Sequence, residues 1–472
     1  MSFEEKFNEL LRGNVVGSQA VIYKNGETFQ YNFGYSSLEE KKEVEDSTIF
    51  RIASISKIVV AMAALKLHEE GRLNIDADLS DIFGFKIRNP HYPDVPITTK
   101  MLMLHTSSIN DGFDDENRDY DNLEVGYNGV NGRSYFVKLE DLLSNKDSKY
   151  YTDKTFLNKL PGTHFEYSNF GTGILACVVE KCSGMLFTEY VFKYILKPLG
   201  VDASFRASEI EKKEMISDTF LFNNEFKTYR TSKSFIDNTY PFFEVGQNFR
   251  GPAGGLFISM QDLARVMITL MNDGIYEDVQ ILKKETVDLM LQMHYLGPRT
   301  DYLAKGLQLK FIDPIPNLLL KGHNGSAYGV SSYMYFSKEE NLGICFIANG
   351  GNYKAARPGL NNIQANVLDA FIEEFYEQRQ NIVLKFNINN NFAHLNNRKI
   401  LLKDPQVINE EVYLDLLDTA NILNVIPRII EDKVYINDFE VEFVKGKIAL
   451  FKLLDSLEIH YARVLDNYEI YL

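Results

Sequence analysis

The sequence predicts an α+β protein whose main sheet is antiparallel and is assembled from both ends of a long first domain. Two β-strand patterns occur near the N-terminus, within residues 18–33, and further ones return between residues 306 and 349. From about residue 80 to residue 300, helical patterns and long polar loops dominate. The simplest assembly joins the strand-rich ends in one sheet, flanks it with helices and inserts a helical domain.

The N-terminal strands carry the strongest local signal. After residues 1–11, a charged amphipathic segment that predicts a short helix, the runs Ser18–Lys24 and Glu27–Phe33 flank the pair Asn25-Gly26. The second run alternates aromatic with polar residues. Asn-Gly between two such runs is typical of a β-hairpin.

The other elements of this domain follow from hydrophobic periodicity and capping residues. We expect helices from Ser54 to near Gly71 and over residues 98–104, 170–182, 263–271 and 360–377, and strands over residues 306–312, 329–336 and 342–349. Residues 110–135 are rich in Asp, Asn, Gly and Tyr and predict a long surface loop, a feature that is often functional in compact domains.

The chain is expected to divide into two domains. Residues 1–380 form the first, with a sheet part at about 1–78 and 300–380 and a helical part at about 79–299. An asparagine-rich joint follows. Residues 385–472 contain short alternating runs, which predict a small, mostly β C-terminal domain.

Composition excludes several classes of protein. The 472 residues are 45% hydrophobic, which is ample for a large core, and the net charge of -15 argues against nucleic acid or an anionic membrane as the main partner. Three scattered cysteines indicate neither a disulfide framework nor a zinc site. No run of 18 apolar residues and no signal-peptide pattern occur, so we expect a cytoplasmic protein, or an exported one if a leader has been removed. Nothing in the sequence fixes the oligomeric state.

The segment Phe50–Lys57 holds the first candidate for catalysis. Ser54 and Lys57 are three residues apart at the start of an apolar helix, and this is the one S-x-x-K in the chain. A serine hydroxyl is a weak nucleophile that needs a proton acceptor beside it, and a partly desolvated lysine amine can serve. The alternative is an N-cap serine followed by a solvated first-turn lysine.

Two further short patterns hold groups that such a serine requires. Tyr167 and Asn169 precede the helix at 170–182, where a phenol can shuttle protons and an amide can orient the lysine. His323-Asn324-Gly325 lies before a strand, where a glycine lets a substrate approach closely and the N–H of a following residue can stabilise an oxyanion. The alternatives are a capping asparagine with a core tyrosine, and a turn histidine.

Taken in this order, the three patterns resemble those of the serine β-lactamase and penicillin-binding-protein superfamily, in the branch of class C β-lactamases, D-stereospecific peptidases and family VIII-type carboxylesterases. Five stretches carry the resemblance, which spans about residues 15–375. Phe50–Lys57 is similar to the family's F-R-I-A-S-x-S-K, Met101–Ser108 to its L-L-x-H-T-S-G with Ser108 in place of glycine, Phe165–Asn169 to its F-x-Y-S-N, Pro252–Leu256 to its P-A-G-G-L, and His323–Gly325 to its H-x-G.

The resemblance implies the β-lactamase/DD-peptidase fold and a set of residue roles. Ser54 would attack a carbonyl carbon to form an acyl-enzyme, and Lys57 and Tyr167 would exchange the protons. Which of the two is the acylation base stays open. The oxyanion would lie between the backbone N–H groups of Ser54 and Ser326. Asn169, His323, Asn324 and Gly325 would contact substrate.

The resemblance also ranks substrates. His323 replaces the lysine of the lactamases, and a histidine is mostly neutral at pH 7, which lowers the expectation of an efficient β-lactamase. A D-amino-acid-containing peptide or amide ranks first, with a carboxylesterase or weak β-lactamase as the alternative. A non-turnover penicillin-binding sensor is the alternative of another class. No metal or organic cofactor is implied.

Overall fold

The structure, a computed structural model, describes most of the chain. It covers residues 1–111, 127, 136–297, 304–315 and 318–377, and residues 383–471 with gaps at 388–391, 396–397, 404, 409–410, 431–432, 438, 445, 458 and 465–466. The long loop expected at residues 110–135 lies largely outside the described residues.

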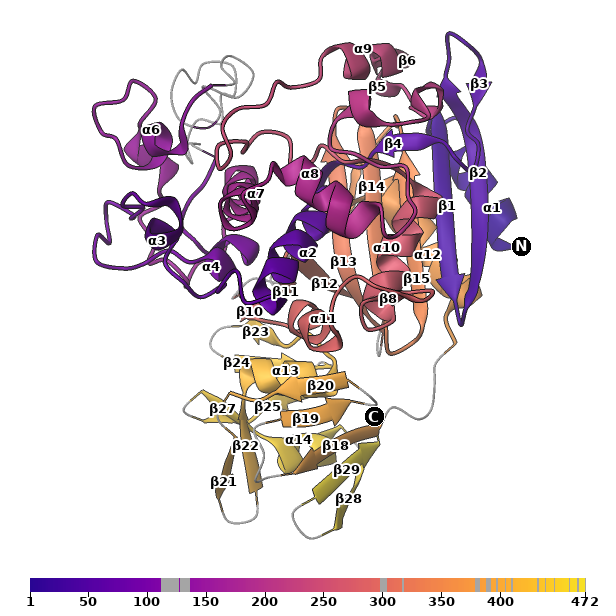
Figure 1. The fold of residues 1–472 in the computed structure, drawn as a ribbon. Coiled ribbons are helices and arrows are strands. Elements are labelled where there is room, and N and C mark those ends of the chain that lie inside the picture. The colour runs from indigo at the N-terminus through magenta and orange to yellow at the C-terminus, as the bar shows by residue number, and fades with distance from the viewer. Residues whose placement is uncertain are drawn as a thin grey trace.

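A nine-stranded sheet is the centre of the first domain (Figure 1), and its neighbouring strands pair antiparallel. In spatial order its strands are β10 (Tyr295–Leu296), β11 (Ala304–Gly306), β12 (Leu309–Ile315), β13 (Leu318–Ala327), β14 (Val330–Ser337), β15 (Leu342–Ala348), β1 (Gly17–Lys24), β2 (Glu27–Ser37) and β3 (Lys42–Glu43). The expected hairpin at Asn25-Gly26 is confirmed, and β1 pairs on its other side with β15, so both ends of the domain do form one sheet.

Helices cover both faces of this sheet because its strands are apolar on both sides. On one face, α1 (Phe3–Leu11) and α12 (Asn362–Phe375) pack on side chains such as Ile22 and Phe346. On the other face lie α2 (Ser56–Glu69), α10 (Met260–Met271) and α11 (Lys284–Leu291), with Val21 and Cys345 in the same core. The α+β prediction is confirmed.

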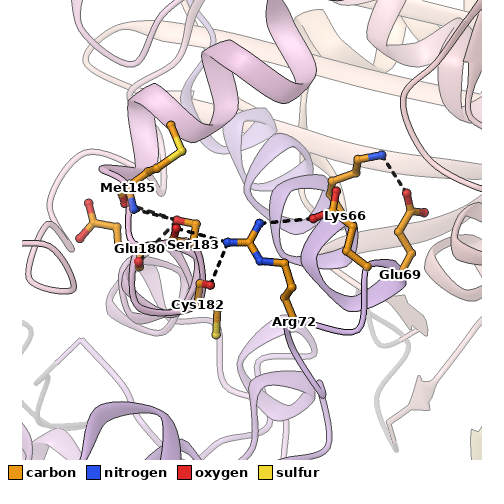
Figure 2. A network of polar contacts seen from close by, with 8 residues as sticks. Lys66, Glu69, Arg72, Glu180, Cys182, Ser183 and Met185 are labelled. Carbon is orange, nitrogen blue, oxygen red and sulfur yellow. Dashed lines mark hydrogen bonds and ion pairs between the residues drawn. The ribbon is translucent and has the colours of Figure 1, made fainter.

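Helix α7 (Asn169–Ser183) belongs to the helical part and packs beside α2. Arg72, which follows α2, connects the C-terminal ends of the two helices. Arg72 Nη2 donates to the carbonyl oxygens of Cys182 and Ser183, both at 3.2 Å, and so satisfies acceptors that a helix end leaves open. Figure 2 shows this side chain between the two helix ends, next to the Lys66–Glu69 ion pair. The opposite ends of α2 and α7 meet at the site described below.

Other elements complete the helical part. They are α3 (Leu79–Phe83), α4 (Thr99–Met103), α6 (Leu139–Leu143), α8 (Phe187–Val191) and α9 (Ser232–Asp237), with the short strands β4 (Ile49–Arg51), β5 (Thr219–Asn223), β6 (Glu225–Arg230), β7 (Phe257–Ser259), β8 (Ile275–Tyr276) and β9 (Val279–Gln280). The hairpins β5–β6 and β8–β9 were not expected in this region. Among the described residues no single helix is long and apolar enough to cross a membrane; only residues 169–183 and 187–196 together, bent by 75°, meet that measure.

The C-terminal residues form small sheets with two helices, and in Figure 1 they lie below α11 and β10. One sheet contains β18 (Val383–Asn387), β19 (Phe392–Leu395), β20 (Arg398–Leu401), β28 (His460–Val464) and β29 (Asn467–Tyr471); the others contain β21 (Gln406–Ile408), β22 (Glu411–Asp415), β26 (Phe443–Val444) and β27 (Lys447–Ala449), and β23 (Arg428–Ile430), β24 (Lys433–Ile436) and β25 (Phe439–Val441). The helices α13 (Leu416–Leu423) and α14 (Leu450–Ser456) pack on them.

Candidate active site

Ser54 is placed by a strained turn between a strand and a helix. Ile52 N donates to Leu256 O at 2.9 Å, and Ala53 then has a φ of 53°, a left-handed conformation that is costly for a residue with a Cβ. Ser54 follows in the 3-10 turn η1 (Ala53–Ile55), and α2 begins only at Ser56. Ser54 is therefore not a helix cap, and the turn places it in the wall of a cleft.

Three side chains meet within hydrogen-bonding distance. Lys57 Nζ lies 3.2 Å from Ser54 Oγ, and the Tyr167 hydroxyl donates to Ser54 Oγ at 2.7 Å. Lys57 is fully buried, so the alternative of a solvated first-turn lysine is wrong. Its other contacts are Asn169 Oδ1 at 2.9 Å and the carbonyl oxygen of Ala253 at 2.6 Å.

Burial sets the protonation of this cluster. It lowers the pKa of Lys57 to about 7; the charge of Asp111 opposes that shift and the charge of Lys310 adds to it. Burial also raises the pKa of Tyr167 above its usual value of 10, although the Ser54 hydroxyl partly offsets the change. At neutral pH much of Lys57 is an uncharged amine and Tyr167 is a phenol.

Asp111 anchors the three residues that directly follow Tyr167. Its carboxylate accepts from Ser168 Oγ at 3.1 Å, from Asn169 Nδ2 at 2.9 Å and from Phe170 N at 2.8 Å. Ser168, and not Asn169, is the cap of α7, since its hydroxyl accepts from Gly171 N. Asn169 is therefore free to bridge Asp111 and Lys57, and the capping alternative is wrong.

Strand β13 forms the opposite wall of the cleft. β12 pairs with it only as far as Gly322, so within the described residues 323–327 pair with β14 alone and their outer edge faces the cleft. A Cβ on Gly325 would lie 2.6 Å from Ile52 O and 2.5 Å from Ser332 Oγ. The glycine therefore lets the strand lie against the turn that carries the nucleophile. Ser54 and Ser326 both line the cleft, and their role as oxyanion donors stays a prediction.

His323 is a buried strand residue and not a turn histidine. Burial holds its pKa well below 6.5, with Lys310 and Lys57 adding to the shift, so the ring is neutral. Its Nδ1 lies 2.5 Å from Asn324 O, and its ring centre lies 6.2 Å from that of Tyr167.

Lys310 supplies the charge that His323 lacks. It comes from the neighbouring strand β12, lines the cleft and donates to Asn324 Oδ1 at 2.6 Å. Burial lowers the pKa of Lys310 to about 8, which leaves it mostly protonated at pH 7. An ammonium therefore stands at this end of the cleft, contributed by a residue that the motifs do not include.

The cleft has a volume of about 540 Å³ and two unlike ends. Lys310 and Asn324 lie together beside His323, whereas Arg51 packs on Tyr328, two residues beyond Ser326; Tyr240 also lines the cleft. Every candidate residue named from the sequence except Gly325 lines this cleft or contacts Ser54 directly, and Gly325 packs behind it. Sequence reasoning missed Asp111, Lys310 and the Ala253 carbonyl. Of these, Ala253 alone had a signal, since it lies in the family-like stretch Pro252–Leu256.

Fold and site together define a protein of the serine β-lactamase and penicillin-binding-protein superfamily. The chain belongs to the Beta-lactamase family, which matches residues 3–368. It is 26% identical over 347 residues to Protein flp of Staphylococcus aureus strain NCTC 8325 / PS 47, an alignment that covers 72% of this chain and 61% of that protein. The chain thus spans about three fifths of the length of the curated relatives it matches.

Solved structures share the fold at low identity. The octameric penicillin-binding protein homologue from Pyrococcus abyssi has a TM-score of 0.58 at 20% identity, with 99% of this chain and 96% of that chain covered. D-amino acid amidase from Ochrobactrum anthropi SV3 has a TM-score of 0.57 at 18% identity, with 79% and 98% covered. EstCE1, a hydrolase with promiscuous acyltransferase activity, has a TM-score of 0.61 at 18% identity, with 78% and 97% covered.

Proposed function

We propose that this protein is a serine hydrolase that forms an acyl-enzyme on Ser54 and acts on a D-amino-acid-containing peptide or amide. The observation that carries the proposal is the contact of Ser54 Oγ with both a buried amine whose pKa is about 7 and a phenol that donates to it. A nucleophile, a base near neutrality and a proton donor then lie within one hydrogen-bond network.

In the acylation step Lys57 is the better base. Its neutral amine accepts the Ser54 proton as Oγ attacks the carbonyl carbon, while Tyr167, whose pKa is raised, holds its proton. The carbonyl oxygen becomes an oxyanion between the N–H groups of Ser54 and Ser326. As the carbon–nitrogen bond breaks, Tyr167 gives its proton to the leaving nitrogen. The Lys57 ammonium, 4.9 Å from the centre of the tyrosine ring, replaces that proton.

Deacylation repeats these roles with water. Water attacks the ester carbon, its proton passes to the Tyr167–Lys57 pair, and Ser54 leaves with a proton returned from the same pair. Asn169 and the Ala253 carbonyl hold Lys57 in place through both steps, since each accepts from its Nζ.

The substrate class follows from the charge at one end of the cleft. The leaving group departs beside Tyr167, the side on which Lys310 and His323 lie. A leaving amino acid with a free carboxylate suits the Lys310 ammonium and the Asn324 amide. The fold shared with a D-amino acid amidase supports the choice of D-residues over L-residues.

A turnover panel with a labelling control tests the proposal. Wild-type protein is expected to hydrolyse D-Ala-D-Ala peptides or D-amino-acid amides faster than p-nitrophenyl esters or nitrocefin. Ser54→Ala is expected to abolish both turnover and labelling by a fluorophosphonate or a fluorescent penicillin, whereas Ser144→Ala, outside the cleft, should retain both. Labelling retained in Ser54→Ala would overturn the assignment. Turnover of esters alone would favour the carboxylesterase alternative, of nitrocefin alone a weak β-lactamase, and stoichiometric labelling without turnover a penicillin-binding sensor.

A further inference from the structure

The turn between β13 and β14 contains a residue that its backbone does not favour. Ala327 pairs with Val330, so Tyr328 and Gly329 form a two-residue turn, and their φ angles are 53° and 86°. A turn with both residues in the left-handed region favours Asn-Gly, since a bulky side chain with positive φ is strained.

The same chain shows the favoured solution elsewhere. In the β1–β2 hairpin the two turn residues are Asn25 and Gly26, with φ angles of 51° and 98°. The two turns have nearly the same backbone at the first position and differ in the residue that occupies it. The turn itself therefore does not require a tyrosine at position 328, since an asparagine would adopt the same backbone with less strain.

The large side chain of Tyr328 is also partly exposed to solvent, although burial would stabilise it more. It is 44% exposed and lines the cleft. Its ring is held in place, because the Arg51 guanidinium lies 4.4 Å from the ring centre and Tyr229 of β6 stacks on it at 5.9 Å with 13° between the rings. A strained, exposed and rigidly held aromatic residue in a substrate cleft points to a function.

The position of Tyr328 in the cleft indicates which part of the substrate it contacts. Tyr328 lies two residues beyond Ser326, in the turn that follows β13, whereas His323 lies three residues before Ser326 on the strand, so the two flank the expected oxyanion site. The proton donor Tyr167 lies near His323, which puts the leaving group at that end. The acyl part of the substrate extends toward Tyr328. Tyr240, 39% exposed, lines the same cleft.

We propose that Tyr328 is a specificity-determining residue that, with Tyr240, binds a planar aromatic group on the acyl side of the substrate. Aromatic rings at 4.5–7 Å attract one another beyond their burial, so such a group gains binding here that an aliphatic group of the same size does not. The proposal rests on the proposed function for the position of the scissile bond, but it requires only an acyl-enzyme and no particular leaving group.

The test compares two esters with one leaving group and acyl groups of similar size, p-nitrophenyl phenylacetate and p-nitrophenyl cyclohexylacetate. Wild-type protein is expected to prefer the phenylacetate in kcat/KM. Tyr328→Asn is expected to lower the ratio of the two kcat/KM values about 3- to 10-fold and to leave the melting temperature unchanged or higher, since asparagine suits the turn. Tyr328→Phe, which keeps the ring, should retain the ratio.

Two controls separate this role from a merely structural one. Glu277 has a φ of 50° in the two-residue β8–β9 turn and does not line the cleft, so Glu277→Asn should relieve similar strain without changing the ratio. Tyr229→Leu removes the stacking partner alone. An equal fall in the ratio for Tyr229→Leu and Tyr328→Asn, together with a lower melting temperature in both, would mean that Tyr328 only braces the β5–β6 hairpin, and would overturn the proposal.

The remaining outcomes are distinct. Hydrolysis of both esters with the same ratio in wild type and Tyr328→Asn overturns the aromatic subsite and leaves the serine hydrolase standing. Hydrolysis of neither ester by a protein that does hydrolyse the D-amino-acid amides of the turnover panel overturns the aromatic subsite alone. No acyl-enzyme detected by mass with either the esters or the amides overturns the proposed function, and this proposal falls with it.

Discussion

Lys57 is buried among acceptors, and this arrangement decides what the residue can do. Taking an ammonium out of water disfavours the charged form, and the three oxygen atoms around Nζ restore only part of the lost hydration. The pKa near 7 that results places the amine at the point where it is both often deprotonated and still a useful proton acceptor at neutral pH.

A pH profile of acylation tests that role. Because the neutral amine is the reactive form, the rate of acyl-enzyme formation should rise with pH and level off above about 7. Stopped-flow labelling with a fluorescent penicillin from pH 5 to 9 measures the profile. A profile that is flat across this range would exclude Lys57 as the base.

Asp111 provides the matched variant for this experiment. Its negative charge raises the pKa of Lys57 against the effect of burial, so Asp111→Asn should move the inflection to lower pH. A purely structural role for Asp111 would lower the rate without moving the inflection. Asp76→Asn, outside the cleft, is the control for the substitution itself.

At the scale of elements, the site depends on two helices that converge. α2 brings Lys57 and α7 brings Asn169, and both helices are buried along most of their length. Strand β13 closes the site from the other side and lies so near to the nucleophile turn that only a glycine fits at position 325. The distances within the site are thus set by packing between elements that are far apart in sequence.

Arg72 fixes the distant ends of the same two helices, and its removal is a test of how rigidly they are coupled. Arg72→Ala leaves the last carbonyls of α7 to water and should reduce the free energy of unfolding by about 0.5–1.5 kcal/mol. Since the cores of α2 and α7 remain packed, kcat should change less than about 2-fold. Lys227→Ala, which breaks an exposed pair with Glu225, should change stability by about 0–0.3 kcal/mol. Thermal unfolding measures the stability of both variants. An equal loss of stability in the two would contradict a stabilising role for the contacts of Arg72 with α7.

Many of the helices and strands could be predicted from sequence, because turn residues and hydrophobic periodicity are local signals. The hairpin at Asn25-Gly26, the helices at 98–104 and 170–182 and the strands at 329–336 and 342–349 follow from turn residues and periodicity, whereas strand β13 was not predicted. Lys310 could not be predicted, since its direction depends on the register of β12, and a shift by one residue would turn it to the other face. Asp111 stood within a run of loop-like residues that gave no reason to single it out.

At the scale of the whole molecule, the C-terminal domain packs on the first domain near the active site. Asn421 of α13 accepts from Met293 N at 2.7 Å and donates to Met293 O at 2.9 Å, and it is buried. Phe311 lies in the cluster that contains Ala420, and it is the neighbour in β12 of Lys310, which faces the cleft. The C-terminal domain therefore supports the strand that carries the cleft's ammonium.

Substitution of Asn421 tests this support in the full chain. Asn421→Ala leaves a buried N–H and a buried carbonyl of Met293 without these partners and should destabilise the protein by about 1–3 kcal/mol. Asn421→Asp keeps the acceptor for Met293 N but buries a carboxylate against the Met293 carbonyl oxygen, so it should cost at least as much as Asn421→Ala. Chemical denaturation followed by fluorescence measures both. A variant as stable as wild type would show that the two domains do not depend on this contact.

The change in composition predicts a separate C-terminal domain, but the sequence gives no sign of where residues 383–471 pack. Asn421 and Met293 are ordinary residues in their own segments, and their pairing exists only once both domains have folded. Substrate preference could not be predicted from sequence for the same reason, since the cleft residues Lys310, Tyr328 and Tyr240 come from three separate segments of the chain.

The pairing of β1 with β15 has a consequence for how the protein is made. Ser18 is opposite Ala348 in the pairing of β1 with β15, so nearly the whole first domain must leave the ribosome before the two halves of the sheet can join. Until then α2, which is apolar on all sides, has no finished surface to bury itself against, and Ser54 has no opposing strand. Contacts of such long sequence separation form late and slowly. Reactivity toward acylating probes should consequently appear only after β15 has left the ribosome, which makes it a direct reporter of the closure of the sheet.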